Sequence, residues 1–217
     1  MTNIKHSSAT VEHYTPIWLV EKARYVLGEI DLDPASSPIA NEAVKARRVF
    51  TAEQNALWQP EWKGRTFLNP PGGLVDGLGQ PVIRGKKGQP GCTETGVCGL
   101  PPGHAHENVT SSQVAFWRVI TSNWQSGNIP AAFFVGFSVE LLQQAQSFVG
   151  PQPLDFVCCI PSQRIKFDRI VDGKRVVGRS PTHANILVLI GGERSTHELF
   201  RYSLLEVGYI HQPKESP

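Results

Sequence analysis

Short apolar runs alternate along the chain with longer stretches in which apolar residues recur every three to four positions. The short runs predict buried strands, and the longer stretches predict helices with one apolar face. The predicted helices occupy residues 16–27, 37–47, 112–124, 138–148 and 196–207. The predicted strands occupy residues 29–33, 48–51, 65–68, 131–137, 156–160 and 185–190. This alternation favours an α/β fold with a mainly parallel sheet that helices cover on both faces.

Two stretches interrupt the alternation. The dipeptide Asp172-Gly173 lies between two strand-like runs within residues 164–179 and is a strong signal for a two-residue hairpin. We expect this hairpin to give the sheet an antiparallel C-terminal edge. Residues 73–112 are rich in glycine and proline and poor in large apolar residues, so they predict a long loop or insertion. The chain is therefore interpreted as one domain, residues 1–217, interrupted by this insertion.

Length and composition are those of an ordinary folded domain. The chain has 217 residues, of which 40% are hydrophobic and 18% charged, enough to build one sizeable core. No apolar run reaches the roughly 18 residues of a membrane-spanning helix, and the N-terminus lacks the apolar region of a secretory signal. We therefore expect a cytoplasmic protein without membrane contacts. The net charge of +2 is too small to indicate nucleic-acid binding, so DNA contacts would need local clusters of cations.

The strongest local motif is Asn69-Pro70-Pro71, directly after the predicted strand 65–68. Two prolines fix φ twice and remove two backbone donors, so the turn is rigid and presents carbonyl acceptors. The side-chain oxygen of Asn69 and the carbonyl of Pro70 could both accept hydrogen bonds from one planar NH2 group. Such bonds would direct the nitrogen lone pair toward an electrophile, as methylation of an amino group requires. The alternative is an ordinary proline-rich turn.

A second predicted strand ends in carboxylates, at Asp31 and Asp33, before Pro34 and Ala35. A carboxylate at a strand end, followed by a tight turn into a helix, suits the ribose hydroxyls or the amino group of a nucleoside cofactor. Aspartate also caps helices commonly, so this motif alone is a weak signal.

The order and spacing of several segments resemble one known family, the phage-type Dam family of DNA N6-adenine methyltransferases. The similarity is dense at residues 14–16, 31–37, 40–41, 50–51, 55–57, 62–65 and 67–71. It is looser at residues 117, 134–137, 164–167 and 180–185.

The resemblance implies a shortened Rossmann-like methyltransferase fold that transfers a methyl group from S-adenosylmethionine to N6 of adenine in double-stranded DNA. A phage or prophage enzyme of this kind would act in the cytoplasm of its bacterial host. The cofactor would be bound by Tyr14, Thr15, Pro16, Asp31, Asp33, Pro34, Ala35 and Asn55. The target amine would be held by Asn69, Pro70, Pro71 and Gly72.

The sequence departs from the family's pattern at Gly72, where an aromatic residue that stacks on the flipped base is usual. One branch of the family has two glycines after the prolines, as here. We expect another aromatic residue, Trp58, Trp117 or Phe137, to stack on the base. Two other functions stay open. The first is methylation of N4 of cytosine, because the same turn would bind that amine. The second is a DNA-binding protein with a degenerate cofactor site and no turnover.

Cations cluster on the predicted hairpin and could follow the DNA phosphates beside the active cleft, supporting base extrusion. They are Arg164, Lys166, Arg169, Lys174, Arg175 and Arg179. Strand alternation would place Ile165 and Phe167 on one face and Arg164, Lys166 and Asp168 on the other. A solvated hairpin surface is the alternative.

Four potential metal ligands lie within fifteen residues of the insertion, at Cys92, Cys98, His104 and His106. Two thiolates and two imidazoles fit a tetrahedral structural zinc site, although the spacing is not that of a common zinc finger. The alternative is a loop with incidental cysteines. The other two cysteines, adjacent in the apolar run 156–160, are interpreted as small core residues.

Overall fold

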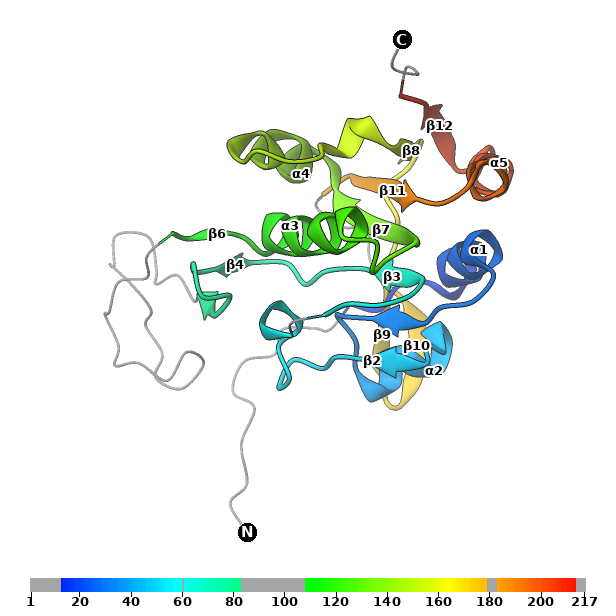
Figure 1. Ribbon diagram of the computed structural model, residues 1–217. Coiled ribbons are helices and arrows are strands. Elements are labelled where there is room, and N and C mark those ends of the chain that lie inside the picture. Colours follow the sequence, from blue (N-terminus) through cyan, green and yellow to red (C-terminus); the bar gives the residue numbers. More distant parts are fainter. Residues whose placement is uncertain (1–12, 60, 83–107, 179–182, 214–217) are drawn as a thin grey trace.

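The computed structural model describes residues 13–59, 61–82, 108–178 and 183–213. Within these ranges, seven strands form a central sheet in the order β12-β8-β11-β7-β3-β1-β2 (Figure 1). Their bounds are Leu32–Asp33 for β1, Arg48–Val49 for β2, Thr66–Leu68 for β3, Ala131–Phe137 for β7, Val157–Pro161 for β8, Asn185–Gly191 for β11 and Gly208–His211 for β12.

The sheet is mixed and mostly parallel, which confirms the α/β class. β1, β2, β3 and β7 pair in parallel. β11 runs antiparallel to both β7 and β8, and β12 runs antiparallel to β8. Five strands therefore point in one direction and two in the other, and the parallel strands present their carboxyl ends at one edge of the sheet.

Helices cover both faces of the sheet. Their bounds are Ile17–Leu27 for α1, Pro38–Val44 for α2, Ser112–Gln125 for α3, Ser138–Gln144 for α4 and Arg194–Leu204 for α5. Short 3-10 helices lie at Ala56–Trp58 (η1), Ala145–Ser147 (η2) and Pro153–Asp155 (η3).

Two hydrophobic clusters fill the space between the helices and the sheet. Phe133 packs in one cluster with Leu19 of α1 and Phe200 of α5, and its neighbour Phe134 packs in the other with Trp117 of α3. Both phenylalanines are fully buried, because successive residues of a strand point to opposite faces of the sheet. Figure 1 shows α1 and α5 side by side along one face.

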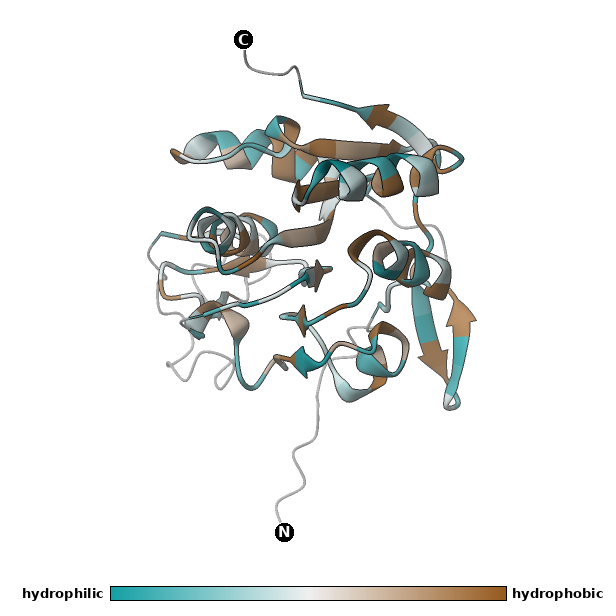
Figure 2. Cartoon of the chain, turned by 45° about the vertical axis from the view of Figure 1, so that its right-hand side comes forward, coloured by the Kyte–Doolittle hydropathy of each residue, from teal (hydrophilic) through white to brown (hydrophobic). Residues whose placement is uncertain are grey.

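The predicted hairpin forms, but not at the predicted place. Its strands β9 (Asp168–Val171) and β10 (Lys174–Val177) meet at Asp172-Gly173, where φ is 50° and 73°, as a two-residue turn with left-handed residues requires. They make a separate two-stranded sheet, which stands at the lower right of Figure 2. The prediction that the hairpin is the antiparallel edge of the main sheet is therefore wrong, since β12 occupies that edge. β9 pairs instead with Tyr14, before α1.

The ends of the insertion also carry structure. β4 (Leu74–Val75), β5 (Pro81–Val82) and β6 (Thr110–Ser111) form a small antiparallel sheet, where the sequence predicted only a loop. Strands of two residues are too short to show a period of two, which is why the pattern missed them.

No helix in the described ranges has both the length and the apolar character needed to cross a membrane.

Candidate active site at the carboxyl edge of the sheet

The turn that follows β3 is tied to the segment before α1. The side-chain nitrogen Nδ2 of Asn69 donates a hydrogen bond to Oγ1 of Thr15 over 3.1 Å. Thr15 is only 8% exposed, so this acceptor has a fixed position. Because the amide nitrogen of Asn69 binds within the protein, its oxygen Oδ1 is the atom left to accept a hydrogen bond from a ligand.

A second buried amide fastens the same turn to the end of β7. Nε2 of Gln113 donates to the carbonyl oxygen of Pro70 over 3.2 Å, and its Oε1 accepts from the backbone N–H of Phe137 over 3.1 Å. Gln113 is 1% exposed. A carbonyl oxygen has two lone pairs, so Pro70 keeps one acceptor position. Gln113 was not among the site residues predicted from the sequence, although a polar residue on the buried side of α3 was a usable signal.

Gly72 lies beside the ring of Phe137. A Cβ atom added to Gly72 would lie 3.6 Å from Cε2 of Phe137, in ordinary van der Waals contact. The Phe137 ring in turn stacks on the ring of His183, with centroids 5.1 Å apart and planes inclined by 29°. The carboxyl end of β7 therefore brings an aromatic pair to the Asn69–Gly72 turn.

The other two aromatic candidates have different surroundings. Trp117 is fully buried, with its ring edge-on to Phe134, and belongs to the core. Trp58 is 52% exposed, and its Nε1 donates to the carbonyl of Leu78 over 2.7 Å. Of the three, Phe137 is the residue that the structure brings to Gly72.

Asp33 ends β1 at the same edge of the sheet. It is 2% exposed, and its Oδ1 accepts from the backbone N–H of Ala35 over 3.1 Å. Burial raises the pKa of this carboxyl to about 6, and the hydrogen bond from Ala35 offsets only part of that effect. Pro34 is buried beside it. Strongly perturbed carboxyls are a feature of ligand and catalytic sites, and the cofactor-binding role of Asp33 stays a prediction.

Asp31 lies apart from this group. It precedes β1, and its Oδ2 accepts from the backbone N–H of Arg65 over 2.8 Å and pairs with the Arg65 side chain at 3.2 Å. Arg47 approaches its other oxygen at 3.5 Å. These partners belong to the amino end of β3 and the start of β2, so Asp31 is part of an ion-pair network, and its assignment to the cofactor stays a prediction.

Asn55 also has partners within the protein. Its Oδ1 accepts from the N–H of Leu57 over 3.1 Å, which caps η1, and its Nδ2 donates to the carbonyl of Gly79 over 2.9 Å. Both polar ends of the side chain therefore connect η1 with the loop after β4.

The hairpin holds the Tyr14–Pro16 segment in place. The backbones of Tyr14 and Asp168 exchange two hydrogen bonds of 2.8 Å. Nη1 of Arg175 donates to the carbonyl of Thr15 over 3.2 Å and lies 3.4 Å from Oδ2 of Asp168, while its guanidinium lies 5.5 Å from the centre of the Tyr14 ring. Arg175, predicted to contact DNA, thus supports the segment that positions Asn69.

Two of the other cations predicted on the hairpin, Arg164 and Lys166, precede β9 and lie outside it. Arg164, Lys166 and Lys174 are exposed, and Arg169 is half-buried. Ile165 and Phe167 are buried as predicted, but Asp168 is buried too, because it pairs with Arg175. Arg179 lies outside the described residues.

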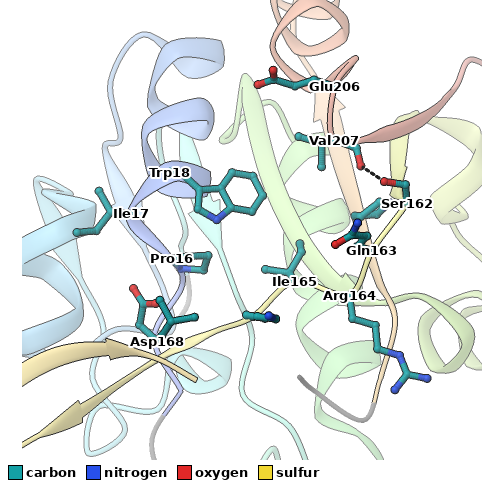
Figure 3. Close-up of a pocket in the computed structure, with 13 residues that line it drawn as sticks. Pro16, Ile17, Trp18, Ser162, Gln163, Arg164, Ile165, Asp168, Glu206 and Val207 are labelled. Carbon is teal, nitrogen blue, oxygen red and sulfur yellow. Dashed lines mark hydrogen bonds between the residues drawn. The ribbon is translucent and has the colours of Figure 1, made fainter. Parts of the chain in front are cut away.

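An open cavity of about 600 Å³ is lined in part by Pro16, the residue after Thr15. Figure 3 shows Trp18 of α1 projecting into it opposite Ile165, with Gln163 and Arg164 on the far wall. Lys166 and Asp168 also line it. The hairpin, the segment before it and the start of α1 therefore shape a concave surface.

The predicted zinc ligands Cys92, Cys98, His104 and His106 lie outside the described residues. Within the described ranges, no group of three or more His, Cys, Asp or Glu side chains is arranged to hold a metal ion. Cys158 and Cys159 are fully buried in the core, and burial raises the pKa of their thiols to about 11 and about 12. Their interpretation as core residues is confirmed.

No family model, no curated protein and no solved structure matches the chain.

Proposed function

We propose that the chain is an S-adenosylmethionine-dependent DNA methyltransferase that acts on N6 of adenine in double-stranded DNA. One observation carries the proposal: the hydrogen bond from Asn69 Nδ2 to Thr15 leaves Oδ1 as the free acceptor on a rigid turn, next to the carbonyl of Pro70. Two acceptors at neighbouring positions suit the two N–H bonds of an exocyclic amine.

The cofactor would lie near Asp33, at the end of β1, and the Thr15–Pro16 segment, whose Thr15 is bonded to Asn69 after the neighbouring strand β3. This placement fits the general rule that open α/β sheets bind ligands beyond the carboxyl ends of their strands. Bound S-adenosylmethionine supplies a methyl group on a sulfonium centre. Asp33 would accept hydrogen bonds from hydroxyls of its nucleoside.

Asn69 and Pro70 would orient the amine, and positioning of this kind is a large part of catalysis when no strong base takes part. They would direct the lone pair of the target nitrogen at the methyl group that the cofactor would supply. The nitrogen would lose one proton to water, because neither Asn69 nor Pro70 can take up a proton at neutral pH. The hairpin cations would contact the phosphates of the DNA.

The test is nucleoside mass spectrometry on DNA from bacteria that express the wild-type protein or Asn69→Ala. We expect N6-methyladenine with the wild type and a loss of roughly a hundredfold or more with the variant, as for other positioned polar groups. Asn128→Ala is the matched control, since Asn128 is a half-buried asparagine before the amino end of β7.

Other outcomes identify the alternatives. N4-methylcytosine in place of N6-methyladenine would establish cytosine as the target. Folded protein that binds DNA but gives no calorimetric signal with S-adenosylmethionine would instead establish a DNA-binding protein without turnover. Full activity of Asn69→Ala would rule out the proposed mechanism.

A further inference from the structure

The backbone at Gly72 does not require glycine. Gly72 is not among the residues with positive φ, so its conformation is open to ordinary L residues. A Cβ atom would fit there in normal contact with Phe137. A larger side chain directed from that Cβ toward the Phe137 ring would collide with it. The ring of Phe137, from β7, therefore lies where a large side chain at position 72 would extend.

Phe137 is positioned by the same residue that positions the turn. Gln113 binds both the carbonyl of Pro70 and the N–H of Phe137, so the ring and the two candidate acceptors belong to one hydrogen-bonded unit. The ring is half-buried and stacks on His183, which is exposed. An aromatic surface with an open side thus stands beside the atoms proposed to hold the amine.

We propose that Phe137 and His183 form the surface on which the extruded target base stacks. The inference rests on the proposed function and adds to it the residues that receive the base. A base removed from the duplex loses its stacking neighbours on both faces, and aromatic side chains replace them in enzymes that act on extruded bases. Here the aromatic group comes from the neighbouring strand, across the turn from Asn69, in place of position 72.

The first test compares Phe137→Leu with Phe137→Tyr in purified protein. Leucine keeps the apolar volume but removes the ring, whereas tyrosine keeps the ring. We expect Phe137→Leu to lower kcat/KM for methyl transfer to DNA about tenfold or more, in line with the free energy that base–aromatic stacking contributes. We expect kcat/KM of Phe137→Tyr to stay near that of the wild type. Phe148→Leu is the control, because Phe148 is also half-buried but lies near η2 and the Arg118 side chain.

The second test moves the ring from one position to the other. Gly72→Tyr should be impaired because its side chain meets Phe137, and Phe137→Ala should be impaired because the ring is lost. The double variant Gly72→Tyr/Phe137→Ala should be more active than the product of the two single effects predicts, because the new tyrosine enters the space that Phe137 left.

A direct readout uses oligonucleotides with 2-aminopurine in place of the target base, once the methylated sites in the host DNA are known. Stacking quenches the fluorescence of this base analogue, so the bound Phe137→Leu complex should be brighter than the wild-type complex. Cofactor affinity and the melting temperature should be unchanged in Phe137→Leu.

The proposed function and the stacking role of Phe137 are overturned by different results. Wild-type protein that transfers no methyl group to DNA overturns the proposed function. An active wild type, together with full activity and unchanged fluorescence in Phe137→Leu and no recovery in the double variant, leaves the proposed function in place and overturns only the stacking role of Phe137 and His183.

Discussion

The side chains of Asn69 and Thr15, 54 residues apart in the sequence, meet in a hydrogen bond of 3.1 Å. This bond joins the turn after β3 to the segment before α1. In this bond Nδ2 of Asn69 faces Thr15, and Oδ1 is the other end of the amide. The orientation of a single side chain therefore depends on how the first helix is attached to the domain.

Thr15→Val should lower the rate of methyl transfer about tenfold, because the substitution keeps the side-chain shape but removes the acceptor that orients Asn69. Thr15→Ser keeps the hydroxyl and should restore most of the rate. Single-turnover measurements with saturating DNA and cofactor separate this effect from changes in binding. Equal rates for the valine and serine variants would show that Thr15 does not orient Asn69.

Asp33→Asn should stabilise the ligand-free protein at neutral pH. Burial raises the pKa of Asp33 from 3.8 to about 6 in the folded protein. The contribution of this carboxyl to the free energy of unfolding is therefore fully present below about pH 4 and is lost as the pH rises through 6. Asparagine keeps the acceptor for the Ala35 N–H but carries no charge. Urea unfolding should show the variant more stable than the wild type by up to about 3 kcal/mol at pH 8, with no such gain at pH 4. A constant difference at both pH values would contradict burial of the ionised carboxyl.

The same substitution should weaken the binding of S-adenosylmethionine at least tenfold, since hydrogen bonds to a charged group are the stronger kind. If the cofactor binds the ionised form, wild-type affinity should also be about tenfold lower at pH 5 than at pH 7. Isothermal calorimetry at the two pH values measures both effects. Affinity that is independent of pH and of the substitution would remove Asp33 from the cofactor site.

Two exposed lysines, Lys166 before β9 and Lys174 in β10, should contribute to DNA affinity by contacting the phosphates. Lys166→Ala and Lys174→Ala should each weaken binding and reduce the slope of log K against log salt concentration by about 1. Arg175→Ala should act differently and lower the melting temperature, because Arg175 holds Thr15 and Asp168. Unchanged salt slopes in both lysine variants would indicate a solvated hairpin surface.

Zinc binding by the insertion stays a prediction from the sequence. Protein purified without chelators should contain about one zinc ion per chain, and Cys92→Ser should release it and increase proteolysis within residues 73–112. Cys158→Ala is the control, since Cys158 is buried in the core. Elemental analysis that finds no zinc in freshly purified, reduced protein would exclude the site.

The sequence predicts best the helices and strands whose apolar patterns are long. β7 and β11 each have seven residues and read as continuous apolar runs, and α1 shows helical spacing over eleven residues. The Asn69 turn was placed correctly at a strand end because proline and asparagine end strands for local reasons. β12 was missed because a glycine after a predicted helix, here 196–207, is typical of a helix end, whereas Gly208 begins a strand that pairs with β8.

The sequence predicts at which strand ends the candidate-site residues lie, but it does not predict which side chains contact one another. The apolar pattern placed Asp33 and Asn69 at strand ends, and the resemblance to the methyltransferase family also assigned Asp31, two positions before Asp33, to the cofactor. The structure shows that Asp31 pairs with Arg65 and Arg47. Gln113 and Phe137 reach the Asn69 turn from distant segments, and a pattern along the chain holds no information on which distant residues meet.

The attachment of the insertion has a consequence for how this domain can diverge. The N–H of Ser112 donates to the carbonyl of Gly73 over 3.0 Å, so the two ends of the insertion are joined where it leaves the domain and returns to it. The entropic cost of closing a loop grows only slowly with its length, so the segment between β5 and β6 can be lengthened, shortened or exchanged with little effect on the central sheet. Because the exit lies one residue after Gly72 and the return one residue before Gln113, new surface can be added directly beside the proposed chemistry while the groups that perform it stay in place.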